Sequence, residues 1–236
     1  MKVIAHRGAS GERPENTMPA YRLAVAQRAD MIEIDLHRTR DGAIPITHDA
    51  ELAHLGGRGE IADATLAEVR ALDAGGGERV PLLHEVLDEL GPQIPLNLEL
   101  KVGTRSAYAG LEAATLAEVE RCGLLAQTLF SSFYDAVLAT LRAQSPAARI
   151  ALLISRRSHE KWPERARALG AEALNPELAL VTPELVRAAH DEGLAVYVFT
   201  VDPEHQMRRM LELGVDGLFT NYPARLRKLL ETARVR

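Results

Sequence analysis

With 236 residues, 47% of them apolar and 26% charged, the chain has the composition of a globular protein rather than a disordered one. The formal net charge of −5 without a basic run argues against nucleic-acid binding, and one cysteine excludes a disulfide or thiolate metal site within the chain. No segment approaches 18 consecutive apolar residues and no signal-peptide pattern opens the chain, so we expect a cytoplasmic protein without stable membrane insertion.

Short apolar runs recur along the chain, each followed by polar residues and then by a helical pattern. This alternation predicts βαβ units and a parallel sheet. The eight expected strands are 3–5, 31–36, 96–100, 128–130, 150–154, 172–174, 195–199 and 217–219. Eight units favour an α/β fold with a closed (β/α)8 TIM barrel, a count that depends on the weak sixth run. We therefore expect one domain over residues 1–236.

Helix starts and one long connection complete this picture. Thr182-Pro183 and Asp202-Pro203 each match a helix N-cap followed by proline in the first turn. The chain between the second and third strands is longer than a βα unit needs. We interpret residues of about 50–81 as a small insertion after the second strand region, with a capping-box helix that starts at Thr65.

The second and third strands carry polar residues at alternate positions. Glu33 and Asp35 alternate with apolar residues, which places both carboxylates on the barrel-facing side, about 6.6 Å apart along the strand. Asn97, Glu99 and Lys101 take the same side of the third strand. Three carboxylates and one ammonium group should therefore meet inside the barrel.

Buried carboxylates need positive charge nearby, because desolvating each ion costs several kcal/mol. Three hard oxygen ligands, without cysteine or closely spaced histidines, favour one divalent cation, Mg²⁺ or Ca²⁺. The alternative is an ion-pair cluster of the same carboxylates with Lys101 and Arg7, which would need no metal.

Two histidines end extended segments, where the active sites of parallel barrels lie. His6 closes the first strand and precedes Arg7, and His48 closes an extended run over 44–49. Two such imidazoles can cleave a phosphodiester when a divalent cation, Arg7 and Lys101 lie beside them. One imidazole takes a proton from the nucleophile and the other protonates the leaving oxygen. The other histidines are interpreted as ordinary surface or core residues: His37, His54, His84, His159, His190 and His205.

Together these motifs resemble those of bacterial cytoplasmic glycerophosphodiester phosphodiesterases. The similar stretches span most of the chain and comprise 6–8, 14–17, 33–35, Thr39, 41–42, 48–49, 99–101, 131–133, 199–202 and 214–217. The resemblance implies a (β/α)8 barrel with a small inserted segment. It implies a metal held by Glu33, Asp35 and Glu99, and acid–base catalysis by His6 and His48.

The resemblance also implies that Arg7 and Lys101 contact the phosphate and that Glu15 and Asn16 belong to a polar loop supporting the site. The implied reaction is metal-dependent hydrolysis of small glycerophosphodiesters, such as glycerophosphocholine or glycerophosphoethanolamine, to glycerol 3-phosphate and an alcohol. Whether a cyclic phosphate forms first stays open. Phe199 could form an apolar wall against the substrate or simply pack in the core.

Some positions depart from what is common among such proteins. Phe199 stands where tryptophan is frequent, Asp202 where asparagine is, and Asn221 where aspartate is. The chain after His48-Asp49 lacks a stretch resembling Arg-Thr-Thr-Asn-Gly, which affects how the glycerol or alcohol end is held.

Alternative functions are a lysophospholipase D-like enzyme, a cyclising phosphodiester lyase of the same superfamily, or a non-catalytic phosphate-binding barrel. Two histidines argue against binding alone, which needs no acid–base pair. The expected partner is a small-molecule glycerophosphodiester, with no nucleic acid; a homo-oligomer is compatible with the sequence.

Overall fold

The computed structural model describes residues 1–234 and contains a closed barrel of eight parallel strands. The strands are β1 (Lys2–His6), β2 (Met31–Leu36), β3 (Leu96–Leu100), β4 (Thr128–Ser132), β5 (Arg149–Ile154), β6 (Ala173–Pro176), β7 (Ala195–Val198) and β8 (Gly217–Thr220). Each strand pairs with its neighbours in sequence, and β8 pairs with β1 to close the barrel. The predicted (β/α)8 fold is confirmed, including the weak sixth strand.

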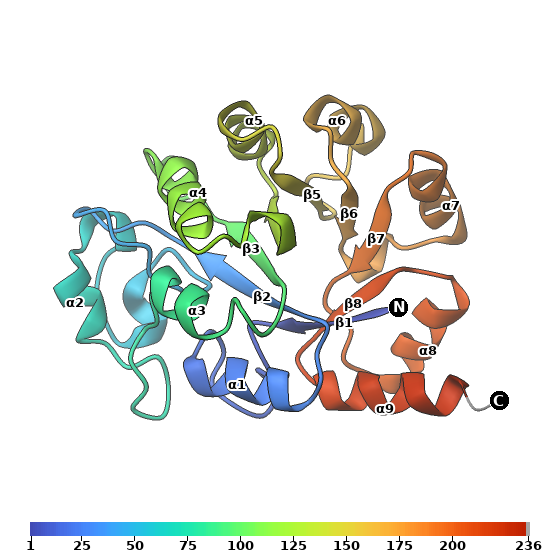
Figure 1. Cartoon of the computed structure of the whole chain (residues 1–236), viewed down its shortest axis with the longest axis horizontal. Helices are drawn as coiled ribbons and strands as arrows, with labels where there is room; N and C mark the ends of the chain where they lie inside the picture. The colour runs from blue at the N-terminus through green and yellow to red at the C-terminus, as the bar shows by residue number, and fades with distance from the viewer. Residues whose placement is uncertain (235–236) are drawn as a thin grey trace.

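Helices lie outside the strands, around the barrel (Figure 1). They are α1 (Met18–Ala26), α2 (Leu66–Arg70), α3 (Leu83–Glu89), α4 (Leu111–Arg121), α5 (Asp135–Gln144), α6 (Trp162–Leu169), α7 (Pro183–Asp191), α8 (Glu204–Glu212) and α9 (Pro223–Arg234). Short 3-10 turns are η1 (Leu52–Leu55), η2 (Ile61–Asp63), η3 (Leu125–Gln127) and η4 (Leu178–Leu180).

The apolar core has two main layers, set by the alternation of side chains along each strand. Ile32, Ile34 and Leu36 of β2 belong to the large buried cluster between the strands and the helices. Inward-facing residues such as Met31 and Phe219 form a smaller cluster inside the barrel. Burying each such side chain contributes about 1.5–3 kcal/mol, so these layers fix the strand positions that carry the polar residues.

The two predicted N-caps have different outcomes. Thr182 caps α7, its hydroxyl accepting from the Leu185 amide, as expected. The prediction for Asp202 is wrong, because Pro203 precedes α8 and makes no side-chain cap. The Asp202 carboxylate instead accepts hydrogen bonds from Thr220 and Asn221, groups at the end of β8 that the sequence pattern does not reveal.

The long connection between β2 and β3 carries α2 and its flanking loops at one edge of the molecule (Figure 1). The capping box at Thr65 is present. A small apolar cluster lies within this connection, formed by Leu52, Leu55, Ile61, Ala64, Val69 and Val80. The division into one domain with an insertion at about 50–81 stays a prediction.

The extended run expected over 44–49 does not form a strand. Pro45 and Ile46 make only isolated antiparallel bridges, with Leu82 and Leu36 respectively. Proline lacks the N–H that a continuing ladder would require, which limits pairing here. His48 therefore lies on a loop that returns along the end of β2, and not at the end of a strand.

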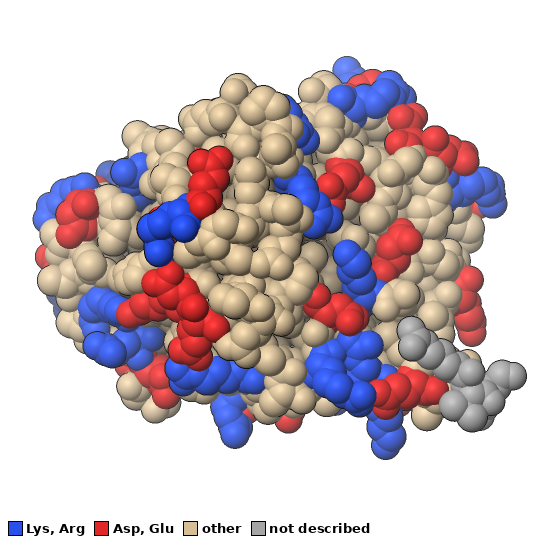
Figure 2. Space-filling view, viewed as in Figure 1, with Lys and Arg blue, Asp and Glu red and all other residues tan. Residues whose placement is uncertain are grey.

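The surface shows acidic and basic side chains interspersed over the face seen in Figure 2. Within residues 1–234, no helix has the length and apolar character needed to cross a membrane.

Candidate active site

A cavity of about 250 Å³ is lined by most of the residues that the sequence predicts to form the site. It lies where β1, β2 and β3 end and the returning loop approaches them. Its lining residues are His6, Arg7, Glu33, His48, Asn97, Glu99, Lys101, Ser131, Phe133, Leu153, Phe199, Thr200 and Phe219. One side of the cavity is charged and the other is apolar and aromatic.

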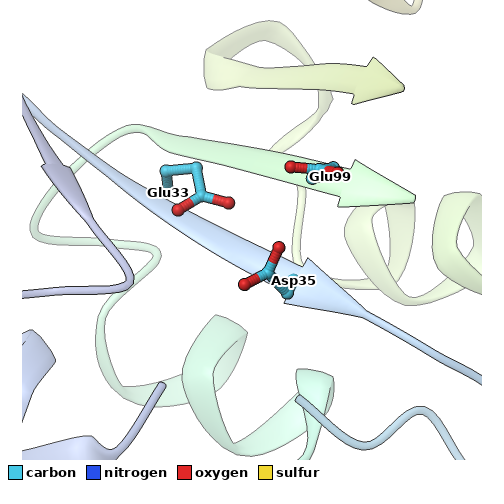
Figure 3. Close-up of side chains that lie close together, drawn as sticks. All are labelled: Glu33, Asp35 and Glu99. Carbon is cyan, nitrogen blue, oxygen red and sulfur yellow. The ribbon is translucent and has the colours of Figure 1, made fainter. Parts of the chain in front are cut away.

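Three carboxylates from β2 and β3 lie together beside this cavity (Figure 3). Glu33, Asp35 and Glu99 each offer an oxygen within 4.8 Å of the others, and they are only 2%, 1% and 9% exposed. The strand register explains the proximity, since Asp35 pairs with Glu99 across the two parallel strands. The predicted cluster of inward carboxylates is therefore present.

Two cations neutralise part of this cluster. Lys101 Nζ lies 3.0 Å from Asp35 Oδ1 and 2.8 Å from Glu99 Oε1, and Arg7 Nε lies 3.2 Å from Asp35 Oδ2. Burial alone would raise the pKa of Asp35, but Lys101 and Arg7 outweigh it and hold that pKa below its usual range. Burial, followed by repulsion from Asp35 and Glu99, raises the pKa of Glu33 well above its ordinary value.

The cluster fits a divalent cation. Three carboxylates face two cationic side chains, so one negative charge is unmatched when all are ionised. Glu33 Oε2 accepts from the Arg7 backbone N–H at 2.9 Å, but its Oε1 is buried without a hydrogen-bond partner. An unmatched charge and an unpartnered hard oxygen are what Mg²⁺ or Ca²⁺ would satisfy. Glu33, Asp35 and Glu99 could therefore hold such an ion.

The loop after β1 is shaped by unusual backbone angles. Arg7 has φ +57° and Gly8 has φ +83°, both in the left-handed region. A Cβ on Gly8 would lie 2.7 Å from the backbone of Ala20, so glycine allows the loop to pack against α1. This turn aims the Arg7 amide at Glu33 while its side chain reaches Asp35.

Glu15 and Asn16 support the site from outside the cavity, Glu15 with an exposed side chain and Asn16 with a buried one. Arg7 donates to both carboxylate oxygens of Glu15, at 3.0 and 2.9 Å. Asn16 Nδ2 donates to Asp35 Oδ2 at 2.8 Å, and its Oδ1 accepts from the Tyr21 hydroxyl at 2.9 Å. Both residues thus orient charged groups of the cluster, and neither lines the cavity.

The His6 imidazole is hydrogen-bonded to Asn221, which follows the last strand, β8. Its Nδ1 lies 2.8 Å from Asn221 Oδ1, which also accepts from the Ser10 hydroxyl. Asn221 Nδ2 donates to Asp202 Oδ2 at 2.8 Å, and this bond fixes the orientation of the amide. His6 Nδ1 must therefore donate, leaving Nε2 without a proton. Burial, followed by the charge of Arg7, lowers the pKa of His6 to about 4.

The His48 side chain is more exposed than that of His6. Its Nδ1 is 2.7 Å from Asp49 Oδ1, so the carboxylate accepts and Nε2 is the free nitrogen. The His48 carbonyl accepts from Nε2 of His37 at 3.2 Å, and His37 Nδ1 accepts from the Tyr108 hydroxyl at 2.7 Å. His37, interpreted from sequence as an ordinary residue, thus positions the His48 backbone.

Sequence reasoning missed these supporting residues for different reasons. Asp49 stands next to His48 and could have been inferred from that adjacency. Asn221 and Tyr108 carry no local signal, because they meet their histidines only through the closed barrel and its long loops.

The apolar side of the cavity is aromatic. Phe199 makes edge-to-face contacts with Phe133 and Phe219, with ring centroids 5.8 and 6.5 Å apart. Phe199 both lines the cavity and packs in the interior, so the two roles considered for it are compatible.

Comparison with known proteins identifies a consistent set of similar chains. The model of the glycerophosphoryl diester phosphodiesterase family matches residues 6–225. Glycerophosphodiester phosphodiesterases from Caldanaerobacter subterraneus and Bacillus altitudinis are each 34% identical to this chain. The first alignment covers 97% of both chains and the second 98% of both.

Solved structures agree with this match. A Silicibacter pomeroyi crystal structure superposes with a TM-score of 0.92 at 33% identity, covering 99% of this chain and 94% of that one. An Oleispira antarctica phosphodiesterase, solved with the product sn-glycerol-3-phosphate, gives a TM-score of 0.84 at 32% identity, covering 98% of this chain and 97% of that one.

Proposed function

This chain belongs to the glycerophosphoryl diester phosphodiesterase family, and its similar relatives are hydrolases. We propose that it converts glycerophosphodiesters to glycerol 3-phosphate and an alcohol in a cation-dependent reaction. The observation that carries the proposal is that His6, His48, Glu33 and Glu99 line one small cavity, with the Asp35 carboxylate next to those of Glu33 and Glu99. The product bound by the Oleispira antarctica relative supports the same product here.

His6 is the proposed base. Its Nε2 is unprotonated because Nδ1 donates to Asn221 and its lowered pKa keeps the ring neutral at pH 7. It takes the proton of the attacking oxygen, either of water or of a neighbouring glycerol hydroxyl, as that oxygen bonds to phosphorus. His48, protonated on both ring nitrogens with its Nδ1–H donating to Asp49, then gives its Nε2 proton to the leaving alcohol oxygen as the bond between that oxygen and phosphorus breaks. Attack by the hydroxyl gives a cyclic phosphate, which water afterwards opens to glycerol 3-phosphate.

The charged wall would stabilise the phosphoryl group. Glu33, Asp35 and Glu99 would hold the cation, Mg²⁺ or Ca²⁺, which would supply positive charge to offset the negative charge of the phosphate when bound. Arg7 and Lys101 line the same cavity and would balance the charge that develops on the phosphate oxygens. Phe199 would limit water on the apolar side.

The proposal is tested by incubating the enzyme with glycerophosphocholine or glycerophosphoethanolamine and measuring glycerol 3-phosphate directly. His6→Ala and His48→Ala should each lower kcat by about 10²- to 10⁴-fold, the usual contribution of an acid–base group. His205→Ala is the matched control, since His205 is exposed on α8. Full activity in both site variants would exclude this mechanism.

The products also separate the alternatives. A cyclic phosphate that accumulates without glycerol 3-phosphate would identify a lyase. Saturable binding without any product would identify a binding protein.

A further inference from the structure

Asn97 is a buried side chain of the cavity wall with no part in the reaction described above. It is 1% exposed, and it follows Leu96 on β3 as the register partner of Glu33. Its Nδ2 donates to Ser131 Oγ on β4 at 2.9 Å, whereas its Oδ1 has no hydrogen-bond partner. The amide is thus anchored on one side and unsatisfied on the other.

The anchored nitrogen determines where the oxygen points. Ser131 lies on the β4 side of Asn97, so the other arm of the planar amide is turned away from β4 and toward β2 or the cavity. Glu33 stands in the same register row on β2, one strand spacing of about 4.8 Å away. Like Asn97 Oδ1, the Oε1 atom of Glu33 is buried without a hydrogen-bond partner.

Two buried acceptors without donors on neighbouring strands are unfavourable, because each lacks the hydrogen bonds it would make in water. A donor or a cation that contacts both oxygens removes this penalty. Among described residues, no side chain supplies that donor to either oxygen.

We infer that Asn97 Oδ1 is a fourth protein oxygen of the cation site formed by Glu33, Asp35 and Glu99, an inference that rests on the proposed cation dependence. Amide carbonyl oxygens are accepted ligands of hard cations such as Ca²⁺. A neutral fourth ligand also suits this cluster, because it adds an oxygen without adding to the repulsion among three buried carboxylates.

The opposite orientation of the amide gives a contrasting expectation. If Nδ2 donated to Glu33 Oε1 and Oδ1 accepted from the Ser131 hydroxyl, Asn97 would compete with the cation for Glu33. Removing the amide would then leave cation affinity unchanged or increase it. If Asn97 Oδ1 is a ligand, removing the amide should instead weaken cation binding.

The test is isothermal titration of the EDTA-treated protein with Mg²⁺ and with Ca²⁺. Asn97→Leu should weaken cation binding by at least about 10-fold, the lower end of what a lost supporting group costs a metal site. Asn97→Asp keeps an oxygen at this position and should bind the cation at least as tightly as wild type. Asn175→Leu is the matched control, because Asn175 is a fully buried asparagine on β6 whose amide is also unpartnered.

The outcomes separate the two proposals. If wild type binds neither cation, the proposed cation dependence fails together with this inference. If wild type binds and Asn97→Leu binds equally well or better, or Asn175→Leu loses as much affinity, only the role of Asn97 is overturned.

Two further measurements exclude a general folding defect. Without cation, Asn97→Leu should unfold at a Tm close to that of wild type, because removing the unsatisfied acceptor offsets the lost hydrogen bond to Ser131, while the Tm increase caused by Ca²⁺ should shrink. With Tb³⁺ as the probe, luminescence lifetimes in H₂O and D₂O should report about one more bound water in Asn97→Leu, since Ca²⁺-type sites fill a lost ligand position with water. An unchanged water count would overturn the direct contact.

Discussion

His6 and Asn221 are joined by a 2.8 Å hydrogen bond between Nδ1 and Oδ1, although 215 positions separate them in the sequence. The bond forms because β1 and β8 are neighbours in the closed barrel, so the ends of both strands open into one loop region. Asp202 holds the other side of the Asn221 amide. The first and last strands therefore cooperate in setting the tautomer of one histidine.

Replacing Asn221 tests this relationship. Asn221→Ala should lower kcat by up to about 10²-fold, the cost of a misplaced reacting group. Asn221→Asp restores an acceptor but adds a negative charge, which raises the pKa of His6. Because the base must be neutral, the acidic limb of kcat/KM should move to higher pH in Asn221→Asp. An unmoved limb would show that Asn221 does not act through His6.

Replacing Lys101 tests the charge balance of the cluster. Lys101→Met should destabilise the cation-free protein by about 3–5 kcal/mol at pH 7, because buried carboxylates lose their partner. Added Ca²⁺ should recover part of the loss. Urea unfolding with and without Ca²⁺ measures both effects, and Lys228→Met provides the exposed control on α9. Equal stability of the Lys101 and Lys228 variants would contradict the proposed balance.

His37 makes a prediction about pH and stability. Burial lowers its pKa in the folded protein to about 4, below the ordinary value of 6.5. Below pH 6.5 the unfolded state therefore binds more protons, so the contribution of His37 is complete above pH 6.5 and is lost as pH falls toward 4. The maximum slope is about 1.4 kcal/mol per pH unit.

Unfolding free energies measured between pH 7 and pH 4 check this dependence. His37→Gln should flatten the curve, while the exposed control His205→Gln should keep the wild-type slope. Identical slopes in wild type and His37→Gln would mean that His37 is not held in its neutral form by the fold.

The sequence was sufficient to predict the parts of the site that follow from strand periodicity. Glu33, Asp35 and Glu99 were located because alternate residues face the barrel and parallel strands keep a common register. His6 was located because it ends β1.

Other features depend on distant contacts that no local pattern encodes. Asp202 matches an N-cap in sequence, yet its carboxylate instead accepts hydrogen bonds from Thr220 at the end of β8 and from Asn221 after it. The run containing His48 matches a strand, but the returning loop pairs only through isolated bridges. His37 could be assigned a role only once Tyr108, 71 positions later, was placed beside it.

The proposed cation dependence of catalysis is measured most directly by the initial rate of glycerol 3-phosphate release from glycerophosphocholine, before and after complete removal of divalent cations by EDTA. We expect glycerol 3-phosphate release to stop in the cation-free enzyme and to return when excess Mg²⁺ or Ca²⁺ is added. An undiminished rate in enzyme shown to be free of divalent cations would contradict this dependence.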